Sequence, residues 1–140
     1  MNESEVSSRP VLFGRDLLVV EDQPELAEAL SVVLRSLGAT TSVAHDSREA
    51  LAALQHRVPD VVVADIGLPV HDGIWLARRV AASFPTVKLI AMTGFRDPAL
   101  RRAALAARYV AVLPKPLDLA RLVKTIVKAC PECAPTRRAS

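Results

Sequence analysis

Residues 61–73 read VVVADIGLPVHDG: four apolar residues lead directly to Asp65, and a loop punctuated by glycine and proline follows. A short, uninterrupted apolar run of this kind is typical of a strand buried on both faces, as strands in parallel sheets are. In open parallel sheets, ligands bind at the carboxyl ends of the strands. The run therefore predicts a buried strand that brings Asp65 to a functional edge of the sheet.

The composition is that of one globular domain. The chain has 140 residues, of which 51% are hydrophobic and 24% are charged, which is ordinary for a domain of this length. The formal net charge is +3 with no long basic run, so nucleic-acid binding is not indicated. We expect a cytoplasmic protein without membrane association, because no apolar stretch can span a bilayer and the polar N-terminus does not resemble a signal peptide.

The two cysteines, Cys130 and Cys133, lie close together in a Cys-Pro-Glu-Cys sequence near the end of the chain. One such pair cannot complete a tetrahedral zinc site, and it does not follow a strand as a redox motif would. We interpret it as the frayed end of a helix.

Strand and helix patterns alternate five times along the chain. Strands are predicted at residues 16–20, 40–44, 61–64, 87–92 and 110–113, and helices at 24–37, 46–55, 73–84, 97–107 and 118–129. This alternation predicts an α/β fold with a parallel sheet between two layers of helices. Pro114 lacks an N–H, which predicts that the fifth strand lies at an edge. We expect one domain at 15–129, a flexible N-terminal segment at 1–14 and a flexible tail at 130–140.

Four of the predicted strands end in polar side chains: Glu21 and Asp22 after the first, then Asp65, Thr93 and Lys115. A turn, a helix cap or solvation would explain each of them singly, but parallel strands place them on one rim. Three carboxylates on one rim require a hard divalent cation and an ammonium to neutralise them. Because an aspartate can attack phosphorus to form an acyl phosphate, the set favours a phosphoryl-transfer site.

The same positions resemble the receiver domain of two-component response regulators, over roughly residues 15 to 129. The matching stretches are LVVED at 18–22, DIGLP at 65–69 with Asp72 and Gly73, MTG at 92–94, and KP at 115–116. The resemblance implies a flavodoxin-like three-layer sandwich with five helices and a five-stranded parallel sheet in the order 2-1-3-4-5. It also implies a cis peptide bond between Lys115 and Pro116.

The resemblance implies a role for each residue of the rim. Asp65 would accept a phosphoryl group from a histidine of a sensor kinase or a phosphotransfer domain, Thr93 would be the switch hydroxyl, and Lys115 would pair with the phosphoryl group. The cofactor would be Mg²⁺, with Mn²⁺ as a substitute. Its ligands would be Glu21, Asp22, Asp65 and the backbone carbonyl of Gly67.

The implied protein is a phosphorelay signalling protein that switches its binding to an unidentified downstream protein. We expect no enzymatic activity beyond autocatalytic gain and loss of the phosphoryl group at Asp65, no direct DNA binding, and a monomer or a weak dimer. Both a stand-alone receiver and a receiver excised from a hybrid kinase fit, and the start at Met1 mildly favours the first. The alternative is a small Mg²⁺-dependent phosphatase with an aspartyl nucleophile; such enzymes typically need a second aspartate where this chain has Gly67.

Five positions depart from the pattern or lie near the site. The family usually has a tyrosine or phenylalanine where this chain has Val112, and Tyr109 would compensate only if the backbone shifted, so we expect Tyr109 to pack on neighbouring helices. Phe95 is expected to shield the phosphoryl group, while Gly67 leaves the other side open. Trp75 is expected beside, and not within, the inward stripe of the third helix.

Overall fold

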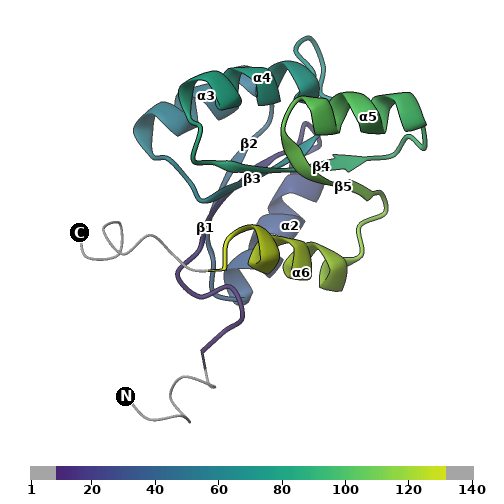
Figure 1. The fold of residues 1–140 in the computed structure, drawn as a ribbon. Helices are drawn as coiled ribbons and strands as arrows, with labels where there is room; N and C mark the ends of the chain where they lie inside the picture. The colour runs from purple at the N-terminus through teal and green to yellow at the C-terminus, as the bar shows by residue number, and fades with distance from the viewer. Residues whose placement is uncertain (1–8, 132–140) are drawn as a thin grey trace.

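In the computed structural model, residues 9–131 are described, and they form five strands alternating with five helices (Figure 1). The strands are β1 (Asp16–Val20), β2 (Thr40–Ala44), β3 (Val61–Asp65), β4 (Lys88–Thr93) and β5 (Tyr109–Pro114). The helices are α2 (Pro24–Ser36), α3 (Ser47–His56), α4 (Gly73–Ser83), α5 (Pro98–Ala106) and α6 (Leu119–Ala129). The predicted succession of elements is confirmed, with Thr93 now inside its strand instead of after it.

All strand pairs are parallel and the order is β2-β1-β3-β4-β5, as in a flavodoxin-like fold. Helices α3, α4 and α5 cover one face of the sheet, and α2 and α6 cover the other (Figure 1). The predicted edge position of β5 is confirmed, and the peptide bond between Lys115 and Pro116 is cis. None of the helices within residues 9–131 is long and apolar enough to cross a membrane.

The central strand β3 explains why both faces of the sheet are covered. Val62 and Ala64 belong to the apolar core under α3, α4 and α5, whereas Val61 and Val63 belong to the core under α2 and α6. All four are fully buried. Since burying one such valine contributes about 1.5–3 kcal/mol, β3 is stable only with helices on both sides.

Four of the helices begin with an aspartate whose carboxylate accepts a backbone N–H of the first turn. These N-caps are Asp46, Asp72, Asp97 and Asp118. Such caps stabilise a helix by about 1 kcal/mol. The helix α2 has no side-chain cap and begins with Pro24, whose fixed φ suits the first turn. The start of each helix is therefore fixed by a residue suited to its first turn.

The packed region extends further toward the N-terminus than the predicted boundary at residue 15. Leu12 is fully buried in the core under α2 and α6, and its N–H donates to the carbonyl of Leu37 at 2.8 Å. The guanidinium of Arg15 donates to the carbonyls of Cys130 and Pro131, at 2.8 Å each. The rest of the two predicted flexible segments, residues 1–8 and 132–140 with Cys133, lies outside the described residues.

Candidate functional site

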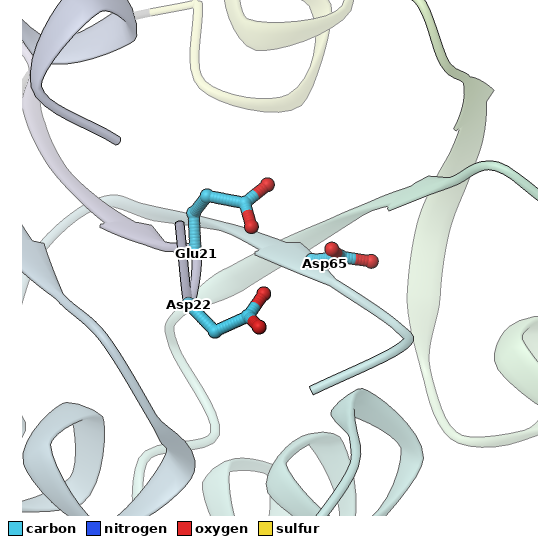
Figure 2. A group of neighbouring side chains, drawn as sticks. All are labelled: Glu21, Asp22 and Asp65. Carbon is cyan, nitrogen blue, oxygen red and sulfur yellow. The ribbon is translucent and has the colours of Figure 1, made fainter. Parts of the chain in front are cut away.

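Three carboxylates converge at the carboxyl ends of the central strands, where Figure 2 shows Glu21, Asp22 and Asp65 gathered close together. One ligand atom from each lies within 4.8 Å of the others. The convergence follows from the sheet register, because Val20 is the partner of Ala64 and the next residues of both strands are acidic. The sequence prediction that these residues share one rim is therefore realised in the structure.

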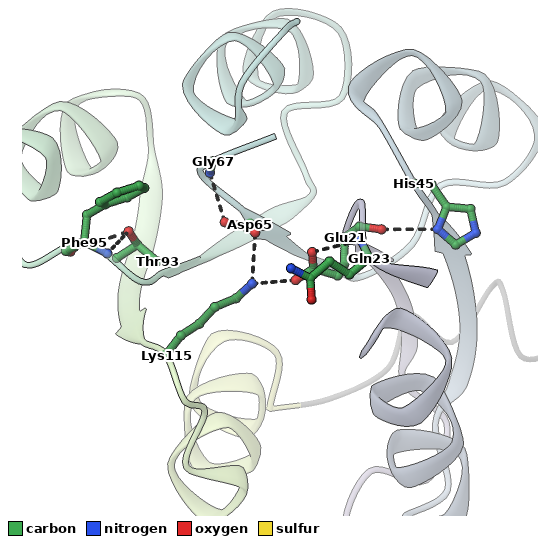
Figure 3. A network of polar contacts seen from close by, with 8 residues as sticks. All are labelled: Glu21, Gln23, His45, Asp65, Gly67, Thr93, Phe95 and Lys115. Atoms are coloured by element: carbon green, nitrogen blue, oxygen red, sulfur yellow. Dashed lines mark hydrogen bonds and ion pairs between the residues drawn. The ribbon is translucent and has the colours of Figure 1, made fainter. Parts of the chain in front are cut away.

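Lys115 lies between two of these carboxylates (Figure 3). Its Nζ donates to Glu21 at 2.6 Å and to Asp65 at 2.9 Å, and its backbone N–H donates to the carbonyl of Thr93 at 2.8 Å. The last bond fixes the lysine to the end of β4. One ammonium thus faces three carboxylates, so the rim holds an excess of negative charge.

Burial shifts the titration of both partners in this ion pair. Burial raises the pKa of the Glu21 carboxyl above its usual range, and the hydrogen bond from Lys115 only partly opposes this effect. For Lys115, burial disfavours the charged form, but the hydrogen bonds to Glu21 and Asp65 outweigh it and raise the pKa of the ammonium. Lys115 therefore stays protonated at neutral pH, whereas Glu21 holds its charge at a cost that a bound cation would lower.

The backbone of Glu21 is fixed by contacts that the sequence analysis missed. Its N–H donates to the carbonyl of Ala44 at 3.0 Å, and its own carbonyl accepts from Nδ1 of His45 at 3.2 Å. The N–H of Gln23 also donates to the Glu21 carboxylate at 3.3 Å (Figure 3). A signal for His45 was present, because it directly follows the predicted strand 40–44, which the implied strand order places beside the first.

The loop after β3 is tied at both ends. Asp65 accepts the N–H of Gly67 through Oδ1 at 2.9 Å, while its Oδ2 faces Lys115. The N–H of Ile66 donates to the carbonyl of Met92, and the N–H of Gly73 donates to the carbonyl of Ile66, both at 2.9 Å. The carboxylate of Asp65 therefore has a fixed orientation at the rim.

Thr93 is buried at the end of β4, and its hydroxyl accepts the N–H of Phe95 at 3.0 Å. The ring of Phe95 is 66% exposed, and its Cε2 lies 3.7 Å from the place a Cβ would occupy at Gly67. That same place is 3.6 Å from Oδ1 of Asp65. Phe95 and Gly67 are therefore neighbours beside Asp65, which differs from the expectation that they lie on opposite sides of it.

The side chain of Val112 is buried where the family usually has an aromatic ring. A hollow of about 350 Å³ lies beside it, lined in part by Thr93, Phe95 and Arg101. The guanidinium of Arg101 lies 3.4 Å from the carbonyl of Val112. The coupling that an aromatic side chain would provide at this position is therefore absent.

Tyr109 packs within the core under α3, α4 and α5, as predicted, and its hydroxyl donates to the carbonyl of Gly73 at 2.7 Å. Burial, and secondarily the charges of Asp72 and Asp65, raise the pKa of its phenol. The contact joins the start of β5 to the first residue of α4. No residue pattern predicted this hydrogen bond.

Trp75 is partly buried against the same core, which agrees with its predicted place beside the inward stripe. Its ring stacks on the His71 ring with centroids 4.1 Å apart. The guanidinium of Arg79 also lies over the Trp75 ring, 4.7 Å from its centroid. Trp75 therefore contacts the apolar core as well as two polar side chains, His71 and Arg79.

The donor set at the rim fits a hard divalent cation. The three converging groups are all carboxylates, and Mg²⁺ prefers a few carboxylate oxygens together with water and phosphate oxygens. Glu21 is almost fully buried while Asp22 is exposed, so a cation would be held from the interior and approached from solvent. No sulfur or imidazole ligand belongs to this cluster, which disfavours zinc and copper.

The fold and the acidic rim together define a flavodoxin-like domain with a candidate cation site at the carboxyl ends of its strands. The family model described as the response regulator receiver domain matches residues 17–127. The chain belongs to this family.

Curated relatives include proteins of different lengths. The chain is 33% identical over 121 residues to an uncharacterized 14.6 kDa protein of Leptolyngbya boryana, and the match covers 85% of this chain and 92% of that protein. It is 39% identical over 110 residues to the DNA-binding response regulator MtrA of Mycolicibacterium smegmatis, with 77% of this chain and 48% of MtrA covered. It is also 33% identical over 114 residues to the transcriptional regulatory protein ZraR of Salmonella typhimurium, with 81% of this chain and 26% of ZraR covered.

Solved structures of receiver domains have the same fold. The signal receiver domain of an HD domain-containing protein from Pseudomonas fluorescens superposes with a TM-score of 0.78 at 29% identity, with 82% of this chain and 93% of that chain covered. The chemotaxis protein CheY4 of Vibrio cholerae also gives a TM-score of 0.78, at 25% identity, with 83% and 98% covered. The recognition of the family from its motifs is thereby confirmed.

Proposed function

We propose that this protein accepts a phosphoryl group on Asp65 and thereby switches its binding to a downstream protein. The observation that carries the proposal is the bridge from Lys115 to Glu21 and Asp65, at 2.6 and 2.9 Å, beside the exposed carboxylate of Asp22. This rim offers a nucleophilic carboxylate, a cation for phosphoryl oxygens and a group of hard ligands for a divalent metal. The match to the receiver family over residues 17–127 supports the same function.

The donor in this proposal is a phosphohistidine of a sensor kinase or a phosphotransfer domain. A carboxylate oxygen of Asp65 attacks the phosphorus, the P–N bond breaks, and the freed imidazole nitrogen takes up a proton. Lys115 then pairs with a phosphoryl oxygen as a point charge. Thr93, whose hydroxyl is held by Phe95, would turn toward the phosphoryl group and change the surface near β5.

The proposed cofactor is Mg²⁺, with Mn²⁺ able to replace it, held by Glu21, Asp22, Asp65 and the backbone carbonyl of Gly67. When bound, the cation supplies positive charge that offsets the charge on the phosphoryl oxygens during transfer. The deep position of Glu21 and its fixed backbone support this role, because they hold a carboxylate toward the cation.

The remaining expectations follow from the receiver assignment. We infer a cytoplasmic protein that acts through protein partners, as a monomer or a weak dimer, with no catalysis beyond the turnover of its own phosphoryl group and no direct DNA binding. Gly67 weighs against the alternative of an aspartyl-nucleophile phosphatase, because the position two residues after Asp65 carries no carboxylate. Its N–H instead donates to Asp65.

Incubation with acetyl phosphate and Mg²⁺, followed by intact-mass spectrometry, tests the proposal. We expect a gain of one phosphoryl mass in the wild-type protein and no gain in Asp65→Asn. The matched control is Asp72→Asn, which alters an acid on the same loop whose present role is to cap α4. This control should be phosphorylated like the wild type.

Two outcomes would contradict the proposal. The first is the absence of a mass gain in the folded wild-type protein under conditions that phosphorylate a known receiver domain. The second is an equal gain in Asp65→Asn, which would place the acceptor elsewhere. Release of inorganic phosphate from phosphomonoesters at many turnovers would instead favour the phosphatase alternative.

A further inference from the structure

An irregular register in β5 brings Tyr109 under the helix that follows the Asp65 loop. Leu89 is the partner of Tyr109, but the next residue, Ile90, is the partner of Ala111, so Val110 is an extra residue on β5. Val110 is 51% exposed, as expected for the unpaired residue of a bulge. The strand β5 therefore contains a backbone shift at Tyr109 that the sequence analysis did not expect.

The bulge changes the face to which Tyr109 belongs. Residues three apart on a regular strand lie on opposite faces of the sheet. Tyr109 and Val112 nevertheless belong to the same buried core, under α3, α4 and α5, because the bulge adds one residue between them. The ring of Tyr109 is thereby buried, at 2% exposure, on the face that carries α4.

The hydroxyl of Tyr109 contacts the residue at which the Asp65 loop ends, Gly73. It donates to the carbonyl of Gly73 at 2.7 Å, and the N–H of Gly73 donates to the carbonyl of Ile66 at 2.9 Å. A Cβ at Gly73 would lie 2.8 Å from the carbonyl oxygen of Asp65, 2.8 Å from Cα of Ile66 and 3.1 Å from the Tyr109 hydroxyl. Gly73, the first residue of α4, thus lies between the Tyr109 hydroxyl and the backbone of Asp65 and Ile66.

We propose that Tyr109 is a positioning residue for the Asp65 loop: its hydroxyl holds Gly73, and thereby keeps Asp65 and the Gly67 carbonyl in the arrangement that binds a divalent cation. The proposal rests on the proposed function of this rim. Loop residues 66–72 leave β3 after Asp65, and the N–H of Gly73 at their far end donates to the carbonyl of Ile66 at 2.9 Å, so a displacement of Gly73 would also disturb the start of the loop. Tyr109 also makes the start of the edge strand β5 sensitive to changes in that loop.

The substitution Tyr109→Phe removes the hydroxyl and retains the ring that fills the core. We expect the dissociation constant for Mg²⁺, measured by isothermal titration calorimetry without a phosphodonor, to rise about tenfold, the lower end of the range for residues that orient metal ligands. With acetyl phosphate, the Mg²⁺ concentration giving half the maximal rate should rise by the same factor. The rate at saturating Mg²⁺ should stay within about twofold of the wild type, as expected for an altered metal affinity alone.

A matched control separates positioning from stability. Val80→Ala removes two methyl groups from the same buried core, about two turns further along α4, at a residue that takes no part in the hydrogen bonds that close the loop. We expect it to lower the melting temperature by at least as much as Tyr109→Phe and to leave the Mg²⁺ dissociation constant unchanged. Amide hydrogen exchange at Gly67 and Gly73 should accelerate in Tyr109→Phe only.

The outcomes distinguish this proposal from the proposed function. An unchanged Mg²⁺ dissociation constant in Tyr109→Phe, or an equal rise in Val80→Ala, would overturn the positioning role while phosphorylation of Asp65 stood. Absence of phosphate uptake in the wild type would overturn the proposed function, and the calorimetry would still decide whether Tyr109 positions the metal ligands. A wild-type protein that binds no Mg²⁺ would overturn the positioning role directly.

Discussion

Both ends of the parallel sheet contain buried carboxylates, but the charges of these carboxylates are neutralised to different degrees at the two ends. At the amino end, the carboxylate of Asp16 forms an ion pair with Arg57, and the carboxylate of Asp60 accepts the N–H of Asp16 at 2.9 Å. The backbone of Asp60 also donates to the carbonyl of Asp16 at 2.8 Å and accepts from Lys88 at 3.0 Å. These contacts join β1 to the segments that lead into β3 and β4.

At the carboxyl end, Glu21, Asp22 and Asp65 converge and Lys115 is their only cation among the ion pairs of residues 9–131. A buried carboxylate without a matching cation is costly. Burial raises the pKa of Glu21, and a buried carboxylate whose pKa is raised beside other carboxylates is typical of a site that binds a further cation. The difference indicates that the amino end stabilises the fold, while the carboxyl end gives up stability for a function.

The largest effect on stability should follow from a change at the amino end. Arg57→Met leaves the Asp16 carboxylate, which is 3% exposed, without its cation. We expect the free energy of unfolding in urea to fall by about 2 kcal/mol with an unchanged m value. Arg48→Met, on an exposed arginine of α3, the helix that ends just before Arg57, is the control and should stay within about 0.5 kcal/mol of the wild type.

The same variant should leave the carboxyl end intact. We expect the folded fraction of Arg57→Met to take up phosphate from acetyl phosphate at the wild-type rate. Loss of phosphate uptake in a variant that is still folded would break the division between a stabilising end and a functional end.

The effect of Mg²⁺ on stability should come entirely from the carboxyl end. A ligand that binds only the folded state at ten times its dissociation constant raises the free energy of unfolding by about 1.4 kcal/mol. We expect this increment in the wild type and in Arg57→Met, and its loss in Asp22→Asn, which removes the exposed ligand. The measurement is urea unfolding with Mg²⁺ and with EDTA; an increment that persists in Asp22→Asn, or disappears in Arg57→Met, would assign the cation to another place.

The sequence was sufficient for the parts of this comparison that depend on local pattern. The run from Val61 to Ala64 predicted a strand buried on both faces, and the alternation of elements then placed Glu21, Asp22 and Asp65 on one rim. Pro114 likewise predicted the edge strand. These predictions succeed because strand direction and order bring backbone positions together before any side-chain contact is known.

Contacts that depend on side-chain reach or on irregular backbone could not be predicted in this way. The ion pair of Asp16 with Arg57 joins residues 41 apart, and nothing in the local pattern selects one arginine among many. The hydrogen bond from Tyr109 to Gly73 requires a β-bulge, and no residue type in β5 predicts a bulge there. Leu12 was assigned to a loose segment because the polar residues around it give no helical or strand period.

The smallest effect concerns the pH dependence of the carboxyl end without a metal. Because burial raises the folded-state pKa of Glu21 above 4.5, the folded protein still holds a proton that the unfolded chain has released between pH 4.5 and that raised value. The contribution of Glu21 to stability is therefore largest at low pH and decreases as the pH rises through this window. Lys115 does not titrate there, since its pKa is raised from 10.5.

Comparison of the wild type with Glu21→Gln in EDTA isolates this contribution. We expect the difference in free energy of unfolding, wild type minus variant, to fall by less than about 1 kcal/mol between pH 4.5 and 7, below the limit of about 1.4 kcal/mol per pH unit for one proton. Urea unfolding at intervals of half a pH unit measures it. A difference that rises with pH would mean that the ion pair with Lys115 outweighs burial of Glu21, and the carboxyl end would then stabilise the fold as the amino end does.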